Sequence, residues 1–497
     1  MRKAIVIGAG LGGLATAARL QHQGYQVTVL EKNAGPGGRC DRFAASGYRF
    51  DTGPTILLMV DALREVFEAV DRDIHDYLHL VRLPFNYRIR FGDGTMLDVS
   101  SDEAAMRGQL EAIEPGAGRA YSRFLEDAAY KYKVARRRFT DRAYRSWAEF
   151  LSPLNGYYFA STRALVPMER FVGQYFRDPR LRLAFSFQTM YLGLSPRDAP
   201  AIYSLLPYTE LHDGIWFPMG GMYEIPLALA RLVEDLGGEL RYDHAVEEVT
   251  VRAGRAVGVR MAGGDELAAD LVVCNADLPQ SYATLVPEAA RGRFTERGLG
   301  RLRYGCSAFM LYLGVDKVYD HLFHHNVFLA PDPDANFSDI FRDQRLSSHP
   351  SFYLHCPART DPLLAPTGGD ALYVLVPVPH LGSAVDWHSE GPRFRERVLD
   401  HIAALAAPDI RDHLVVERMV TPADWADLYG LRHGATFGLA HDFFQVGMMR
   451  PANKARAVDR LYFVGAGTVP GGGVPMVLIG SRLVAERVLR DVGSGRS

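Results

Sequence analysis

The sequence predicts an α/β fold with three parts: a Rossmann-like βαβ unit that opens the chain, a second domain with a mixed sheet, and a helical segment between them. The first observation is an apolar run of strand length at residues 3–7, which a glycine-rich turn and a helix-compatible segment at 14–23 follow at once. The second is the run 25–30, which has the composition of another strand. The third is the alternation of short strands and loops from about residue 287 to 440.

The glycine-rich turn has the GxGxxG spacing of a dinucleotide-binding fingerprint and lies between a strand and a helix, as that fingerprint requires. Gly8 allows the tight turn, Gly10 lets the backbone approach a pyrophosphate, and Gly13 lets helix and strand pack closely. The helix N-terminus adds unpaired N–H groups and a favourable dipole. Glu31, at the end of the second strand, is predicted to accept hydrogen bonds from a ribose. A glycine turn without a nucleotide is the alternative, and at this point the nucleotide is either FAD or NAD.

Length and composition indicate an ordinary globular protein of two or three domains. The chain has 497 residues, 23% of them charged, and a formal net charge of −2, which gives no general attraction to nucleic acid. The fingerprint begins at residue 3, so no signal peptide is expected, and no run of 18 apolar residues predicts a transmembrane helix. We therefore expect a cytoplasmic protein, with contact to a membrane surface left open. The cysteines are far apart and predict no disulfide, thiol redox pair or metal site: Cys40, Cys274, Cys306 and Cys356.

A second glycine-rich stretch follows the βαβ unit. It comprises Gly35-Pro36-Gly37-Gly38-Arg39 and, after a short strand pair, Gly53-Pro54-Thr55. Glycines at this density suggest backbone that passes close to a ligand, and Arg39 is suited to neutralise a phosphate. The alternative is a solvent-exposed loop with an exposed arginine.

Residues 6–31, 37–39 and 50–54 together resemble the amino terminus of the phytoene (carotenoid) desaturase family of flavoproteins, bacterial type, which are relatives of the amine oxidases. The resemblance implies non-covalent FAD in a domain of the glutathione-reductase or amine-oxidase type. It places Glu31 on the adenosine ribose, Arg39 beside the diphosphate, the adenine near Val246, and the last strand, loop and helix over the flavin. The cofactor-binding residues so predicted are Gly8, Gly10, Gly12, Gly13, Glu31, Lys32, Gly38, Arg39, Gly53, Pro54, Thr55, Val246, Gly465, Gly467, Val474, Pro475 and Met476.

The same resemblance divides the chain into three parts. Residues 1–80, 216–290 and 441–497 are expected to form the FAD-binding domain, 81–115 and 291–440 the substrate-binding domain, and 116–215 a helical subdomain that associates with a membrane. The helical part contains a cluster of basic residues interleaved with aromatic ones: Lys131, Lys133, Arg136, Arg137, Arg138, Arg142 and Arg145 with Tyr130, Tyr132, Phe139, Tyr144 and Trp147.

That basic cluster has two interpretations. One is a solvated helix face, and the other is a patch that lies on anionic lipid. Residues 183–218 are rich in aromatic, Leu and Met side chains. They predict either core packing or the wall of a long apolar tunnel.

The family resemblance implies FAD-dependent desaturation of phytoene or a related C30–C40 polyene, with hydride transfer to flavin N5. The chain has no second nucleotide fingerprint, so the electrons are expected to pass to a quinone or oxygen. Asp339, in Ser338-Asp339-Ile340-Phe341, is a candidate catalytic group near the reacting chain, and its alternative is a turn or cap residue.

Three alternative functions stay open at this level. A carotenoid oxygenase or ketolase on the same scaffold is favoured by the loop around Gly472 and by Pro475-Met476, which depart from the form in many phytoene desaturases. An amine oxidase would need an aromatic cage beside the flavin. A prenyl-binding chaperone of the GTPase dissociation inhibitor type would not need the intact Gly8, Gly10 and Glu31.

Overall fold

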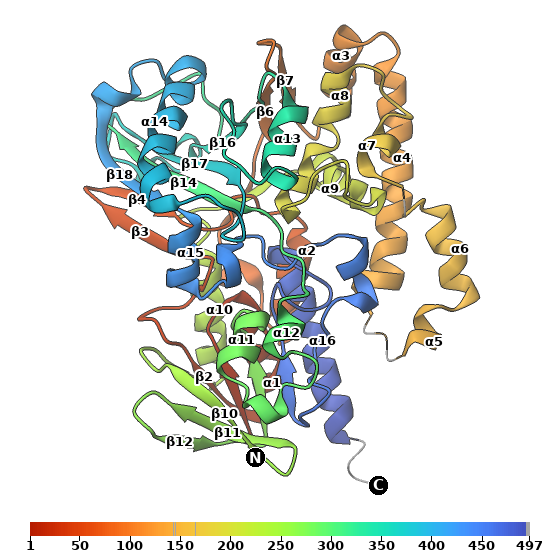
Figure 1. Ribbon diagram of the computed structural model, residues 1–497, viewed down its shortest axis with the longest axis vertical. Coiled ribbons are helices and arrows are strands. Elements are labelled where there is room, and N and C mark those ends of the chain that lie inside the picture. The colour runs from red at the N-terminus through yellow and green to blue at the C-terminus, as the bar shows by residue number, and fades with distance from the viewer. Residues whose placement is uncertain (143, 145, 165, 494–497) are drawn as a thin grey trace.

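The computed structural model describes residues 1–142, 144, 146–164 and 166–493 (Figure 1). A lobe with a parallel sheet lies at the bottom of this view, a lobe with a larger mixed sheet lies above it, and helices form a layer along one side. The described part of the chain begins and ends in the lower lobe. The predicted combination of a parallel sheet, a mixed sheet and a helical segment is confirmed.

The lower lobe is built on a five-stranded parallel sheet. Its strands in spatial order are β19 (Leu461–Phe463), β13 (Leu271–Cys274), β1 (Arg2–Ile7), β2 (Tyr25–Leu30) and β9 (Glu239–Arg241). β1 is central and is hydrogen-bonded to β13 on one side and β2 on the other. Its last four residues are buried, as the uninterrupted apolar run predicts for a strand covered on both faces.

Helices cover one face of this sheet and a small antiparallel sheet covers the other. The helices are α1 (Leu11–His22), α10 (Glu224–Asp235) and α16 (Val474–Gly493), and the antiparallel strands are β10 (Val246–Arg252), β11 (Arg255–Met261) and β12 (Glu266–Ala268). Val6 packs in the helical core, whereas its neighbours Ile5 and Ile7 pack in the core that contains Val249 of β10. This alternation follows from the two-residue period of a strand.

The upper lobe contains a seven-stranded mixed sheet. Its strands in spatial order are β18 (Leu414–Val420), β14 (Ser307–Val315), β17 (Asp370–Val378), β16 (Phe352–His355), β15 (His325–Phe328), β6 (Tyr87–Arg90) and β7 (Met96–Val99). Only the β15–β6 pair is parallel among the described strands of this sheet. β14 is buried along its whole length.

Two layers cover the upper sheet. α14 (Trp387–Leu405) packs on one face, and the hairpin β3 (Arg42–Ala45) and β4 (Tyr48–Asp51) packs on the other with α15 (Pro422–Tyr429). α14 begins at Trp387 because Asp386 caps it by accepting from His388 N, and Pro392 lies inside the helix without ending it.

The helical layer lies beside both lobes. Its main helices are α3 (Glu103–Ile113), α4 (Ala117–Ala135), α5 (Trp147–Phe150), α6 (Pro153–Ser161), α7 (Met168–Val172), α8 (Pro179–Ala184) and α9 (Leu205–Asp213). Figure 1 shows α5 and α6 at its outer edge. The remaining elements are α2 (Val60–Glu68), β5 (Leu80–Arg82), β8 (Trp216–Pro218), α11 (Leu278–Thr284), α12 (Glu296–Leu299) and α13 (Pro333–Phe341).

Among the described residues, no helix is both long and apolar enough to cross a membrane. The parallel sheet draws its strands from residues 2–30, 239–274 and 461–463, so the lower lobe is assembled from stretches far apart in the chain. The division into the three predicted domains stays a prediction.

Candidate cofactor and substrate site

One elongated cavity of about 1180 Å³ runs from the glycine turn after β1 to the helices of the side layer. Ligand pockets typically measure about 300–1,000 Å³, so this one has room for more than a single small molecule. Backbone and polar side chains line one end, and aromatic and aliphatic side chains line the other.

The turn after β1 leaves open backbone at the cavity wall. Gly8 has a positive φ of 94°, and Gly10 is the N-cap of α1 with no side-chain cap and no acidic residue in the first helical turn. A Cβ on Gly10 would lie 2.6 Å from Nδ2 of Asn275, so a larger residue would fill this cradle. An uncapped helix N-terminus with bare backbone around it fits a diphosphate.

Gly12 lines the same cavity, but Gly13 does not. A Cβ on Gly13 would lie 2.2 Å from the carbonyl oxygen of Gly8. Gly13 thus allows α1 to pack closely on the end of β1, as the sequence predicts.

Glu31 is buried at the end of β2, with 5% of its surface exposed, and lines the cavity. Its Oε2 accepts a hydrogen bond from Ala9 N at 2.7 Å and its Oε1 accepts one from Asn33 N at 3.0 Å. A carboxylate oxygen accepts two hydrogen bonds, so both retain capacity for a ligand hydroxyl. The next residue, Lys32, also lines the cavity, and its Nζ donates to Leu428 O at 3.4 Å.

The second glycine-rich stretch forms the adjoining wall. Gly38 and the half-buried Arg39 line the cavity, and Arg39 Nη1 donates to Thr436 O at 3.1 Å. Gly53, Pro54 and Thr55 lie beside them, and Val246 faces the same cavity from the start of β10.

The end of the chain completes this half of the cavity. Gly465 and Gly467 follow β19, and Val474, Pro475 and Met476 line the cavity at the N-terminus of α16. A second helix N-terminus therefore meets the site, from the opposite end of the sequence.

Sequence reasoning missed two residues that hold this half together. Arg450 is buried and donates hydrogen bonds to five backbone carbonyls, those of residues 439, 440, 445, 466 and 468. Burial lowers the pKa of Arg450 to about 10, so it stays charged at neutral pH. His441 lines the cavity and its Nε2 accepts from Gly472 N at 2.8 Å. Burial and the charge of Arg450 hold the pKa of His441 well below its usual value, so the ring is neutral. Neither residue lies in a recognisable motif.

The apolar end of the cavity includes part of the aromatic segment at residues 183–218. The sequence predicted either core packing or a tunnel wall for this segment, and each applies to some of its residues. Phe185 and Phe217 are buried in a hydrophobic core and do not line the cavity. The residues of this segment that line it are Phe187, Met190, Tyr191, Leu192, Pro200, Ile202, Tyr203, Leu205, Leu206 and Thr209.

The predicted basic face at residues 131–147 is not continuous. Lys131 is fully buried, 3.4 Å from Asp127, with its ammonium over the ring of Phe171. Arg136 is half-buried, pairs with Asp141 at 2.9 Å and lines the cavity. Packing of α4 on the other helices turns these two cations inward. The prediction of a solvated or lipid-facing basic face is therefore wrong for Lys131 and Arg136.

Other members of that cluster do reach the surface. Lys133, Arg137 and Arg142 are exposed, whereas Phe139 lines the cavity. Arg145 lies outside the described residues.

Asp339 lies on α13 and is buried, with 6% of its surface exposed. Its Oδ1 accepts from Arg345 Nε at 2.7 Å. Asn336 and Phe337 of the same helix line the cavity, but Asp339 does not. This placement gives Asp339 an ion pair and no contact with the cavity, which argues against the catalytic role that the sequence suggested.

Comparisons with known proteins identify the family of the chain. The chain matches the family of flavin-containing amine oxidoreductases over residues 11–489. It is 46% identical over 489 residues to a zeta-carotene-forming phytoene desaturase of Myxococcus xanthus, covering 98% of this chain and 94% of that protein. The chain belongs to this flavoprotein family, among the carotenoid desaturases. It is an FAD-dependent oxidoreductase, and the predictions of family and cofactor are confirmed.

Two further relatives of this desaturase-family chain cover almost all of it. It is 39% identical to a phytoene desaturase of Neurospora crassa, over 99% of this chain and 85% of that protein. It is 36% identical to a 4,4'-diapophytoene desaturase of Staphylococcus aureus, over 99% of this chain and 100% of that protein.

Solved structures share its fold. An oxidoreductase from Methanosarcina mazei has a TM-score of 0.66 at 18% identity, with 97% of this chain and 100% of that chain covered. Putrescine oxidase has a TM-score of 0.63 at 16% identity, with 99% of each chain covered. These likenesses establish the architecture only.

Proposed function

We propose that this protein uses FAD to desaturate phytoene or a related C30–C40 carotenoid. The observation that carries the proposal is the single cavity that joins a dinucleotide-binding turn to a long apolar chamber. The relatives named as phytoene and diapophytoene desaturases support the substrate class. When bound, FAD supplies a hydride-accepting isoalloxazine.

The roles of the individual cofactor residues are part of this proposal. The open N–H groups at the start of α1, together with Arg39, would hold the diphosphate. Glu31 would accept hydrogen bonds from the adenosine ribose, and the backbone near Val246 would contact the adenine. The residues after β19 and at the start of α16 would enclose the flavin end.

The apolar wall would position the substrate. A hydrocarbon has no polar group to which the protein could form a hydrogen bond, so its orientation depends on the shape of the chamber between α4, α9 and residues 187–192. The same wall excludes water from the reacting carbon atoms.

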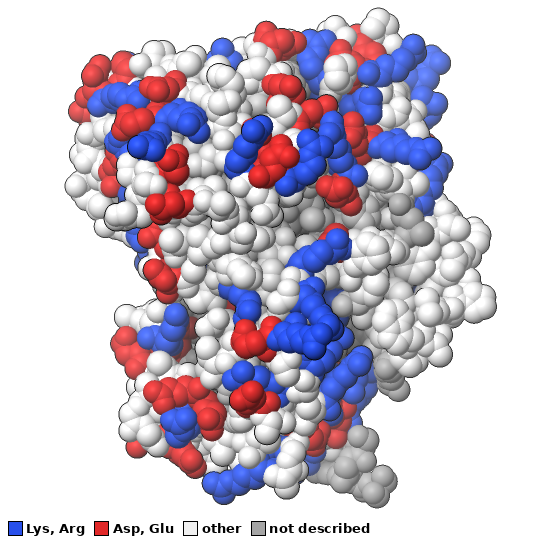
Figure 2. All heavy atoms as spheres, viewed as in Figure 1, with Lys and Arg blue, Asp and Glu red and all other residues white. Residues whose placement is uncertain are grey.

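We also propose that the protein associates peripherally with membranes at the outer end of this chamber. Trp147 and Leu151 are 46% and 68% exposed, and both also line the cavity. Leu154 and Tyr157 on α6 are exposed beside them, and Figure 2 shows few charged side chains on the lobe that α5 and α6 form. An apolar rim where the cavity reaches the surface suits a substrate that is dissolved in a bilayer. The electrons would pass to a quinone or oxygen.

Anaerobic mixing with phytoene-loaded liposomes tests the reaction. We expect the flavin absorbance to bleach and the product mass to fall by pairs of hydrogen atoms. Absence of bleaching, with a gain of oxygen on already desaturated carotenoids in air, would instead favour the oxygenase or ketolase alternative.

Flotation with anionic liposomes tests the membrane contact separately. Leu151→Ser combined with Trp147→Ser should reduce binding, whereas Leu363→Ser should not, because Leu363 is 79% exposed but does not line the cavity. Equal binding of all three proteins would remove the proposed contact.

A further inference from the structure

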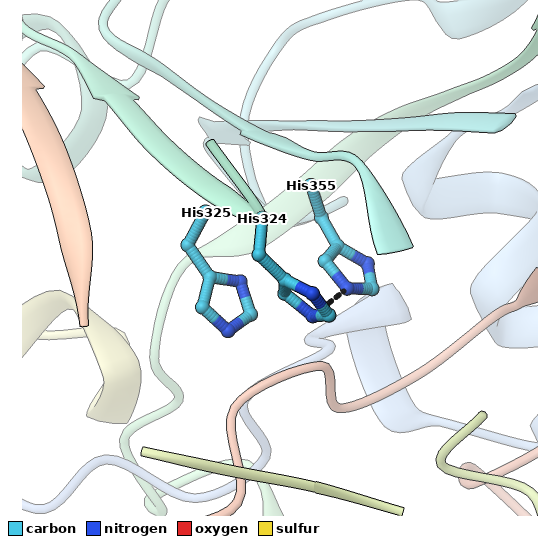
Figure 3. A group of neighbouring side chains, drawn as sticks. All are labelled: His324, His325 and His355. Carbon is cyan, nitrogen blue, oxygen red and sulfur yellow. Dashed lines mark hydrogen bonds between the residues drawn. The ribbon is translucent and has the colours of Figure 1, made fainter. Parts of the chain in front are cut away.

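Three buried histidines lie together behind the cavity wall, at the ends of β15 and β16 (Figure 3). His324, His325 and His355 are 7%, 1% and 1% exposed. His325 and His355 are direct partners in the antiparallel β15–β16 pair, and His324 precedes β15. One ring nitrogen from each can be chosen so that all three lie within 4.8 Å of one another.

Neighbouring hydroxyl groups hold two of the rings at their Nδ1 atoms. His324 Nδ1 is 2.6 Å from Thr360 Oγ1, and His325 Nδ1 is 2.6 Å from Tyr353 Oη. Tyr353 lines the cavity and is also hydrogen-bonded to Thr55 Oγ1 at 2.8 Å. Histidines that bind metals commonly have the nitrogen that does not bind the metal hydrogen-bonded in this way.

The Nε2 atoms of the three rings make no hydrogen bond outside the cluster to any residue that the structure describes. His324 Nε2 and His355 Nε2 are 3.0 Å apart, and Figure 3 marks this contact. His325 Nε2 is buried and has no hydrogen-bond partner among the described residues. A buried polar nitrogen without a partner is destabilising, so its presence in a native protein calls for an explanation.

An aromatic ring closes one side of the cluster. Phe217 packs its ring against His324 and His355 and closes one side of the cluster.

We propose that His324, His325 and His355 bind one divalent transition-metal ion, Zn²⁺ by preference, through their Nε2 atoms. Three imidazoles are a donor set of Zn²⁺ sites, whereas Mg²⁺ and Ca²⁺ need oxygen ligands. With bonds of about 2.0–2.1 Å, tetrahedral ligands lie about 3.3 Å apart. The His324 and His355 Nε2 atoms, 3.0 Å apart, are already close to that spacing, and a ring nitrogen of His325 lies within 4.8 Å of the other two rings.

The ion would serve as a structural tie and not as a redox centre. Zn²⁺ does not change oxidation state, and the cluster joins the end of β15 to β16. Through Tyr353 and Thr55 it would also support the wall of the cavity at the cofactor end. This metal site is independent of the proposed desaturation.

Metal content of the flavin-loaded, tag-free full-length protein tests the proposal. We expect about one zinc ion per chain in the unaltered protein and almost none in His325→Gln or His355→Gln. The matched control is His401→Gln, which removes a ring from the exposed His349–His401 pair, whose nitrogens are 3.3 Å apart. The control should keep its zinc. Flavin content reports whether each variant has folded.

Co²⁺ provides a second readout that does not depend on variants. After chelator treatment, the unaltered protein should take up Co²⁺ with the visible d–d absorption of a four- or five-coordinate site, and equimolar Zn²⁺ should abolish it and raise the melting temperature. A protein that contains no metal and takes up neither ion would overturn the proposal. Full zinc content in both His325→Gln and His355→Gln would also overturn it, because the metal would then lie elsewhere.

Discussion

The two ends of the cavity are built in different ways. At the dinucleotide end, many of the residues that line the cavity are glycines, and the first part of the wall comes from one continuous βαβ unit at residues 2–31. At the apolar end, the wall is mostly side chains, which come from α4, α6, α9 and the segment at 443–449. A wall of backbone tolerates almost no added atoms, whereas a wall of side chains tolerates changes that keep its volume.

The largest expected effect is at Gly13. Gly13→Ala places a Cβ 2.2 Å from Gly8 O, so helix and strand must separate. We expect a loss of about 1–3 kcal/mol in the free energy of unfolding, together with loss of bound flavin. Chemical denaturation and flavin absorbance measure the two effects. Gly108→Ala is the control, because Gly108 is an exposed residue of α3 with no atom within 4 Å of an added Cβ. Equal stability and flavin content in both variants would contradict the close-packing role.

A larger side chain at the apolar end should impair turnover without impairing flavin binding. Ile202→Trp adds volume to the wall of the chamber, far in sequence from the glycine turn. We expect normal flavin content and a fall in phytoene turnover of about 10²-fold, because the hydrocarbon can no longer lie in register with the cofactor. Ile202→Val keeps the shape and should retain most activity. Loss of flavin in Ile202→Trp would show that the two ends are not independent.

Glu31→Gln should weaken FAD binding with little change in the fold. The amide keeps the size of the side chain but removes its negative charge and leaves one acceptor oxygen in place of two, so it would lose a hydrogen bond to the ribose. Loss of a hydrogen bond to a charged group costs about 1.5–3 kcal/mol, so the dissociation constant for FAD should rise about 10- to 150-fold. Fluorescence titration of the flavin-free protein measures it. Glu239→Gln, an exposed residue on the neighbouring β9, should leave FAD affinity unchanged.

A smaller effect concerns Glu210, which lies behind the apolar wall. It is buried and accepts a hydrogen bond from Tyr87 Oη at 2.9 Å, and burial raises its pKa from 4.5 to about 7. The folded state therefore binds more protons than the unfolded state between about pH 4.5 and 7. The free energy of unfolding should therefore fall as the pH rises through that window.

Glu210→Gln should flatten this dependence, because the amide does not titrate. Urea unfolding at several pH values between 4.5 and 8 measures the slope for both proteins. Glu103→Gln, an exposed residue of α3, should keep the slope of the unaltered protein. An identical slope in Glu210→Gln would assign the titration to another group.

Much of the dinucleotide end could be predicted from the sequence, because its geometry is local. The positions of Gly8, Gly10 and Glu31 depend on one strand, one turn and one helix, whose dimensions covalent geometry and backbone hydrogen bonding set. For the apolar end, the sequence predicted a segment rich in apolar side chains but not which of them line the cavity. Nothing in the order of residues distinguishes Phe187, which lines the cavity, from Phe185, which does not.

The basic cluster and the histidines show the same limit. Lys131 belongs to a run of cations in the sequence, yet packing against Phe171 buries it. His355 is far along the chain from His324 and His325, and only the pairing of β15 with β16 brings the three together.

The sequence by itself determined the parallel sheet, the FAD-binding turn and the family, since each depends on residues close together in the chain or on matching over its whole length. Only the tertiary structure decided which aromatic residues face the cavity, which cations reach the surface, and how Arg450 and the three histidines are placed. The physical reason is that burial and side-chain contact depend on packing between distant segments, which no local spacing of residues specifies.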